Sequence, residues 1–139
     1  LCGSSDSLLD VRLSNNSFVG RFPKIDCTMK ELELLSMASN ALTGNLHSSL
    51  GILLPSLREI HLYENQLSST IPSSLFQAPK NLTAVLIGNN RLTGSITSEM
   101  VGSAPNLTHL YVNSNLLSGN LGSFSMTNGL SSLKKLRLE

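Results

Sequence analysis

Apolar residues recur along the chain at a constant spacing around a row of asparagines. Asn16, Asn40, Asn65, Asn90 and Asn115 follow one another at intervals of 24 or 25 residues. Around each asparagine stands one template: Leu, two variable residues, apolar, variable, apolar, two variable residues, Asn, variable, apolar, variable, Gly, variable, apolar. Repetition at such a period is typical of solenoids, in which each repeat forms one coil that packs on its neighbours.

The template divides the whole chain into repeats. The fourth copy fits it at every place and reads Leu82, Val85, Ile87, Asn90, Leu92, Gly94 and Ile96. Residues 1–139 are therefore predicted to form a single solenoid segment with five repeats, at about 8–31, 32–56, 57–81, 82–106 and 107–132, plus the start of a sixth. Because Glu139 directly follows the apolar pair of the sixth repeat, we expect the C-terminal cap to be missing.

Each part of the template predicts a local structure. The alternating apolar pair before the asparagine predicts a short strand with one face inward, and such strands on successive coils pair in parallel. The asparagine amide can bond turn backbone that would otherwise lack a partner. The glycine suits a tight bend. Segments such as 73–77 and 98–101 predict a single helical or 3-10 turn, with Leu75 and Met100 pointing inward.

The repeats resemble the leucine-rich-repeat family, and in particular its plant-type extracellular class, whose consensus is L-x-x-L-x-L-x-x-N-x-L-(T/S)-G-x-I-P. The best matches are N-A-L-T-G at 40–44, N-R-L-T-G-S-I at 90–96 and I-P at 71–72. His47, Thr97 and Gly122 stand where the consensus has proline. The resemblance implies an α/β solenoid: a right-handed superhelix with a parallel β-sheet on the concave face and short helical or 3-10 turns on the convex face. It also implies an extracellular or cell-surface location.

Charge and motif content argue against several other classes of protein. A formal net charge of +1 provides no basic field for nucleic acid, so no nucleic-acid partner is expected. The chain has no phosphate-binding glycine loop and no zinc-type cysteine or histidine spacing. His61 and His109 are two coils apart, about 10 Å, which is too far for one metal ion. We therefore expect a non-enzyme without cofactor or metal.

The variable positions within each strand face outward and form the concave surface. They carry both tyrosines of the chain and two of its three histidines. Tyrosine is enriched where partners bind, and Gly88 beside Tyr63 should leave a local hollow. These features predict a ligand-contact surface of Glu59, His61, Tyr63, Glu64, Leu86, His109 and Tyr111. The alternative is that tyrosine stands there only because it fits a pleated surface.

Two functions remain open at this stage. The resemblance favours a recognition scaffold of the receptor-like kinase, receptor-like protein or polygalacturonase-inhibitor-like kind, which binds a peptide, protein or glycan through its concave face. The alternative is a structural repeat module of a cell-wall, matrix or filament assembly. Self-assembly or contact with a co-receptor is compatible with either one.

Sequons and cysteines bear on the secretory pathway. Asn15, Asn81 and Asn106 each begin an Asn-x-Ser/Thr sequon and are predicted N-glycosylation sites. Asn81 and Asn106 directly precede a repeat, where a side chain can face water, and Asn15, which stands beside the template residue Asn16, is the weaker candidate. Cys2 and Cys27 occupy nearly equivalent places on neighbouring coils, within reach of a disulfide. The alternatives are two buried or free thiols, or a Cys2 whose partner lies elsewhere.

Overall fold

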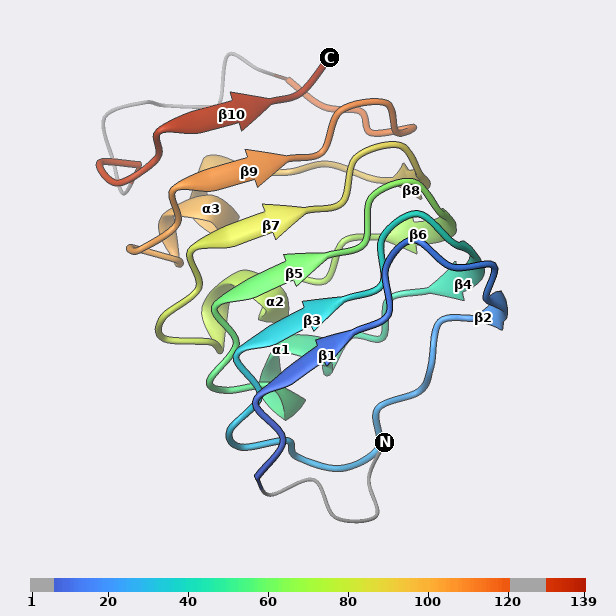
Figure 1. Ribbon diagram of the computed structural model, residues 1–139. Helices are drawn as coiled ribbons and strands as arrows, with labels where there is room; N and C mark the ends of the chain where they lie inside the picture. Colours follow the sequence, from blue (N-terminus) through green and yellow to red (C-terminus); the bar gives the residue numbers. More distant parts are fainter. Residues whose placement is uncertain (1–6, 121–129) are drawn as a thin grey trace.

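The computed structural model describes residues 7–120 and 130–139 as a stack of coils (Figure 1). Each coil contributes one strand to a parallel sheet with the order β1-β3-β5-β7-β9-β10, six strands within the described ranges. The strands are β1 (Asp10–Arg12), β3 (Leu34–Ser36), β5 (Glu59–His61), β7 (Ala84–Leu86), β9 (His109–Tyr111) and β10 (Lys135–Arg137). The predicted parallel solenoid is confirmed.

The register places equivalent template positions side by side. Ile60 on β5 pairs with Val85 on β7, and Val85 pairs with Leu110 on β9. The side chains of all three are fully buried. Stacking one aliphatic side chain on the next fills the interior from coil to coil, with Phe76 as a fully buried ring on the convex side.

The five template asparagines follow the strands of this sheet in sequence, and four of them form hydrogen bonds between neighbouring coils. The Nδ2 atom of Asn65 donates to the Leu62 carbonyl of its own coil and to the Met37 carbonyl of the preceding coil, at 3.2 and 3.0 Å. Its Oδ1 accepts from the Leu42 backbone nitrogen at 3.0 Å. Asn40, Asn90 and Asn115 make the corresponding bonds. Asn16 bonds only carbonyls of its own coil among the described residues.

A second parallel sheet lies beside the first, and the sequence did not predict it. Its order is β2-β4-β6-β8, four strands within the described ranges: β2 (Val19–Arg21), β4 (Ala41–Asn45), β6 (Gln66–Thr70) and β8 (Arg91–Thr93). The template glycine lies within or next to these strands with a positive φ, +84° at Gly44 and +82° at Gly94. The segment around the glycine is thus a short strand, because it pairs between coils, and the backbone departs from the extended conformation at the glycine itself.

Three short helices of the described residues cover the convex side: α1 (Leu50–Leu53), α2 (Ser74–Gln77) and α3 (Ser98–Gly102), behind the first sheet in Figure 1. Leu75 is fully buried and Met100 is half-buried, both packed on the core as expected. Gly51 lies so close to α2 that an added Cβ would meet the Ser74 carbonyl oxygen at 1.9 Å. No helix within the described ranges has the length and apolar character that crossing a bilayer requires.

Candidate functional site

The outward positions of β5, β7 and β9 form rows across the concave face. The pairing places His61 beside Leu86 and Leu86 beside Tyr111 in one row. A parallel row contains Glu59, Ala84 and His109. Five of the seven predicted contact residues therefore stand on adjacent strands, because the coils stack in register.

Each of the two histidines in these rows lies close to a neighbour in sequence, His61 to Glu59 on the same strand and His109 to Thr108, which directly precedes β9. His61 Nε2 lies 2.9 Å from Glu59 Oε2, but the atoms are not aligned for a hydrogen bond. His109 Nδ1 lies within hydrogen-bond distance of Thr108 Oγ1, at 2.8 Å. The His109 and Tyr111 rings meet edge to face, with their centroids 6.2 Å apart.

The concave face is hollowed between β5 and β10, a feature called the concave hollow below. Its volume is about 280 Å³, and its lining residues are Tyr63, Glu64, Leu86, Gly88, Asn89, Tyr111, Asn113 and Arg137. Four predicted contact residues line it, namely Tyr63, Glu64, Leu86 and Tyr111. Glu59, His61 and His109 lie on the same face but outside this lining.

Arg137 lines the hollow but was not predicted as a contact residue, and the same is true of Gly88, Asn89 and Asn113. Its guanidinium carbon lies 4.6 Å from the centroid of the Tyr111 ring, a cation–π geometry. Arg137 occupies the same template position as His61 and Tyr111, since β10 pairs with β9 in register. This shared template position could have predicted that Arg137 belongs to the surface. An arginine in an incomplete sixth repeat is, however, equally typical of an ordinary solvent-exposed charge.

Two backbone features shape the concave hollow. Gly88 leaves room for the next coil, because an added Cβ would meet Asn113 Oδ1 at 2.7 Å. Glu64 has a φ of 56°, a left-handed conformation that glutamate rarely adopts. Its Oε2 accepts a hydrogen bond from Ser39 Oγ at 2.7 Å, which directs the carboxylate toward the preceding coil.

The outward positions of the concave face are buried at the second coil. Leu34 and Ser36 are 9% exposed and Ala38 is fully buried, although all three occupy outward template positions. Ser36 Oγ lies 2.7 Å from Ser14 Oγ, which in turn accepts from the Ala38 backbone nitrogen at 2.9 Å. The outward positions of the second coil therefore offer little exposed surface.

Comparisons with a family model and with solved structures show which known proteins this chain is similar to. The Leucine Rich Repeat family model matches residues 56–78. The chain has the leucine-rich-repeat fold. The structure of the Arabidopsis receptor kinase HAESA with the peptide hormone IDA and the co-receptor SERK1 is similar to it with a TM-score of 0.82 and 31% identity, over 96% of this chain and 22% of that chain.

Two further plant receptor structures are similar to the solenoid. The peptide hormone receptor RGFR1 with RGF2 has a TM-score of 0.83 and 33% identity, over 96% of this chain and 20% of that chain. The PEPR1–AtPEP1 complex has a TM-score of 0.85 and 32% identity, over 96% of this chain and 18% of that chain. The solenoid thus spans about a fifth of the length of these chains. Among curated protein sequences, none matches it.

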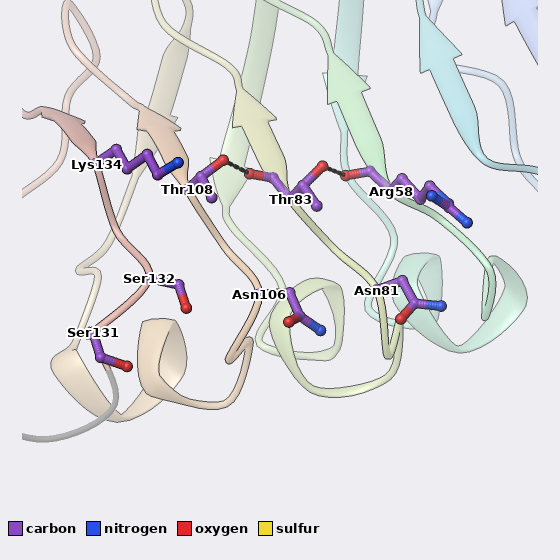
Figure 2. Close-up of a pocket in the computed structure, with 8 residues that line it drawn as sticks. All are labelled: Arg58, Asn81, Thr83, Asn106, Thr108, Ser131, Ser132 and Lys134. Carbon is purple, nitrogen blue, oxygen red and sulfur yellow. Dashed lines mark hydrogen bonds between the residues drawn. The ribbon is translucent and has the colours of Figure 1, made fainter.

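A larger hollow lies where the strands begin, on the side face of the leucine-rich-repeat solenoid, and is called the lateral groove here (Figure 2). Its volume is about 530 Å³, and its lining residues are Arg58, Asn81, Thr83, Asn106, Thr108, Ser131, Ser132 and Lys134. Two of the three sequon asparagines, Asn81 and Asn106, stand in it, and none of the seven predicted contact residues does.

The remaining predicted sites lie near the first coil. Asn15 is exposed and has a positive φ of 58°, and its backbone nitrogen donates to the Ala38 carbonyl at 3.0 Å. Cys27 is half-buried and disulfide-bonded. Its expected partner, Cys2, lies outside the described residues, so the Cys2–Cys27 pairing stays a prediction.

Proposed function

We propose that this solenoid is part of an extracellular recognition module that binds a peptide or protein segment through the concave hollow. HAESA was solved with the peptide hormone IDA, the peptide hormone receptor RGFR1 with RGF2, and PEPR1 with AtPEP1. Since the chain spans about a fifth of those receptors, its own partner and its extracellular location are proposals. Their similarity supports a binding surface on this solenoid.

The composition of the concave hollow is the observation that carries the proposal. Tyr63 and Tyr111 offer rigid aromatic surface at a low cost in side-chain entropy. Leu86 adds an apolar contact between them in the register of the sheet. The amides of Asn89 and Asn113 can donate to and accept from a peptide backbone. An aromatic and apolar surface with a few directed polar groups is typical of peptide-binding sites.

The hollow also carries two opposite charges, from Glu64 and Arg137. Separate positive and negative groups at one site favour a ligand that presents both signs, as a peptide does, over a polyanion. The lateral groove is larger but offers hydroxyls, amides and two cations without an aromatic side chain. Volume alone therefore does not identify the peptide site.

We propose no catalytic role for the concave hollow. Its lining residues include no serine, cysteine or histidine. No group of three His, Cys, Asp or Glu side chains in the described part of the chain is arranged to hold a metal ion. Recognition is the chemistry that these side chains support.

Selection from a random peptide library displayed on phage tests the proposal. Clones selected on the immobilised chain are compared on the Tyr63→Ala/Tyr111→Ala variant and on a Val19→Ala/Ile52→Ala control, whose two residues are exposed and apolar outside the hollow. We expect clones that lose at least tenfold in affinity on the tyrosine variant and bind the control unchanged. A library that yields no tyrosine-dependent clone contradicts the proposal.

The structural alternative gives a different result in sedimentation. If the concave face packs against a second copy, the mass of the chain rises with concentration, and the Tyr63→Ala/Tyr111→Ala variant abolishes the rise. We expect the mass to be independent of concentration. A tyrosine-dependent dimer would replace the recognition proposal by the structural one.

A further inference from the structure

The lateral groove is built from two rows of polar side chains on successive coils (Figure 2). One row precedes the strands of the first sheet: Arg58, Thr83, Thr108 and Lys134. The other lies below it in Figure 2: Asn81, Asn106, Ser131 and Ser132. Every lining side chain carries hydroxyl, amide or cationic groups, so the groove suits a ligand rich in hydroxyl groups rather than an apolar one.

The two sequon threonines already serve the fold. Thr83 Oγ1 donates to the Arg58 carbonyl and Thr108 Oγ1 donates to the Thr83 carbonyl, both at 3.0 Å (Figure 2). Asn106 also connects coils, since its Nδ2 donates to the Lys80 carbonyl at 3.1 Å. The Asn106-Leu107-Thr108 sequon is thus accounted for by coil packing.

Asn81 differs from Asn106 in this respect. It is exposed, and among the described residues its side-chain amide makes no hydrogen bond. It still heads the sequon Asn81-Leu82-Thr83 and lines the lateral groove. The amide therefore has no structural role that explains it and stands at the edge of a polar hollow.

We propose that Asn81 carries an N-linked glycan whose inner sugars lie in the lateral groove. The inference rests on the proposed extracellular location, because the modification requires the secretory pathway. In the transfer, the side-chain nitrogen of Asn81 bonds to the anomeric carbon of N-acetylglucosamine from a polyprenyl-diphosphate oligosaccharide. One amide proton is lost, and the polyprenyl diphosphate leaves with the electron pair of the broken carbon–oxygen bond.

The dimensions and chemistry of the groove fit the inner sugars. A volume of about 530 Å³ is within the range of sites that hold one small ligand. Ser131, Ser132 and Lys134 provide donors and acceptors for sugar hydroxyls and the acetamide group. Asn106 is one coil away from Asn81, about 4.8 Å along the stack, so a second glycan would compete for the same space. One glycan fills the groove and leaves the concave face clear.

Secretion of the chain from insect cells, followed by glycopeptide mass spectrometry, tests the site. We expect a glycan on Asn81 that disappears in Asn81→Gln and in Thr83→Val and persists in Thr83→Ser, which keeps both the sequon and the hydroxyl. We expect the same glycan in Asn106→Gln. An unmodified Asn81 in the secreted wild-type chain overturns the inference.

A second measurement tests whether the sugars occupy the groove. The difference in Tm between the wild type and Asn81→Gln is determined alone and in combination with Lys134→Ala, with Lys30→Ala, an exposed lysine outside the groove, as the matched control. We expect the glycan to raise Tm, and the rise to shrink with Lys134→Ala only. An equal rise in all three backgrounds shows that the glycan lies away from the groove.

These outcomes are separable from the proposed function. Asn81→Gln leaves the concave hollow intact, since Asn81 is not among its lining residues. Peptide clones that require Tyr63 and Tyr111 should therefore bind this variant with unchanged affinity. A chain that binds peptides but carries no glycan refutes only the glycan inference, and a glycosylated chain without tyrosine-dependent clones refutes only the peptide proposal.

Discussion

Arg137 lies over the ring of Tyr111, with the guanidinium carbon 4.6 Å from the ring centroid. The two residues stand opposite each other on the paired strands β9 and β10. An arginine on a tyrosine face is stabilised by the ring quadrupole, by about 0.5–1 kcal/mol at an exposed site. Both residues also line the concave hollow, so the same contact that stabilises the fold shapes the proposed binding surface.

A double-mutant cycle on this pair should detect the interaction. We expect a coupling free energy of about 0.5–1 kcal/mol between Tyr111→Leu and Arg137→Gln, from urea unfolding of the four proteins. Lys135→Gln on the same strand is the control and should show no coupling with Tyr111→Leu. Equal coupling for Arg137 and Lys135 would mean that general charge, and not the ring contact, is responsible.

Replacing the template asparagines should have costs that depend on their place in the stack. Asn65→Ala leaves the buried Leu42 amide without its Asn65 Oδ1 acceptor and removes one of the two asparagine donors from each of the Met37 and Leu62 carbonyls, which should lower the free energy of unfolding by about 1–3 kcal/mol. Asn16 is exposed and bonds only its own coil among the described residues, so Asn16→Ala should cost less than about 1 kcal/mol. Urea denaturation measures both, and equal costs would contradict the coil-connecting role.

Replacing Ser69 by glycine should stabilise the chain. It takes the template glycine position with a φ of 73°, where a Cβ is strained. We expect Ser69→Gly to raise the free energy of unfolding by about 1 kcal/mol. The reverse change, Gly94→Ala, should lower it, because φ is +82° and the new Cβ meets Thr70 Cγ2 at 2.9 Å. If Ser69→Gly is destabilising, as glycine usually is in a strand, the strain argument fails.

Replacing Glu64 by asparagine should stabilise the chain and weaken peptide binding. Its φ of 56° favours asparagine over glutamate, so Glu64→Asn should stabilise the chain by up to about 1 kcal/mol in thermal or urea unfolding. The same variant removes the carboxylate that borders the concave hollow, together with its hydrogen bond from Ser39, and should weaken tyrosine-dependent peptide clones at least threefold. Glu31→Asn, at an exposed glutamate outside the hollow, is the control and should leave peptide affinity unchanged. A stabilised variant with unchanged affinity would remove Glu64 from the proposed site.

Much of the fold could be predicted from the sequence repeat. The interval between the template asparagines and the apolar pairs before them predicted which residues pair, as Ile60 with Val85, and which turn inward. This worked because each coil contributes few buried side chains, and each of them packs on its equivalent in the next coil. The outward rows, and hence five of the seven predicted contact residues, followed from the same register.

The second sheet and the shape of the surface depended on the tertiary structure. A segment such as β8 has three residues with only Leu92 buried, an alternation too short to predict a strand, and its pairing with β6 makes it one. The concave hollow depends on Gly88 and Asn113, which are 25 residues apart in sequence and in contact across coils. The repeat by itself determined the order of the coils. The packing of non-repeating side chains between coils decided where Tyr111, Arg137 and Tyr63 enclose a space.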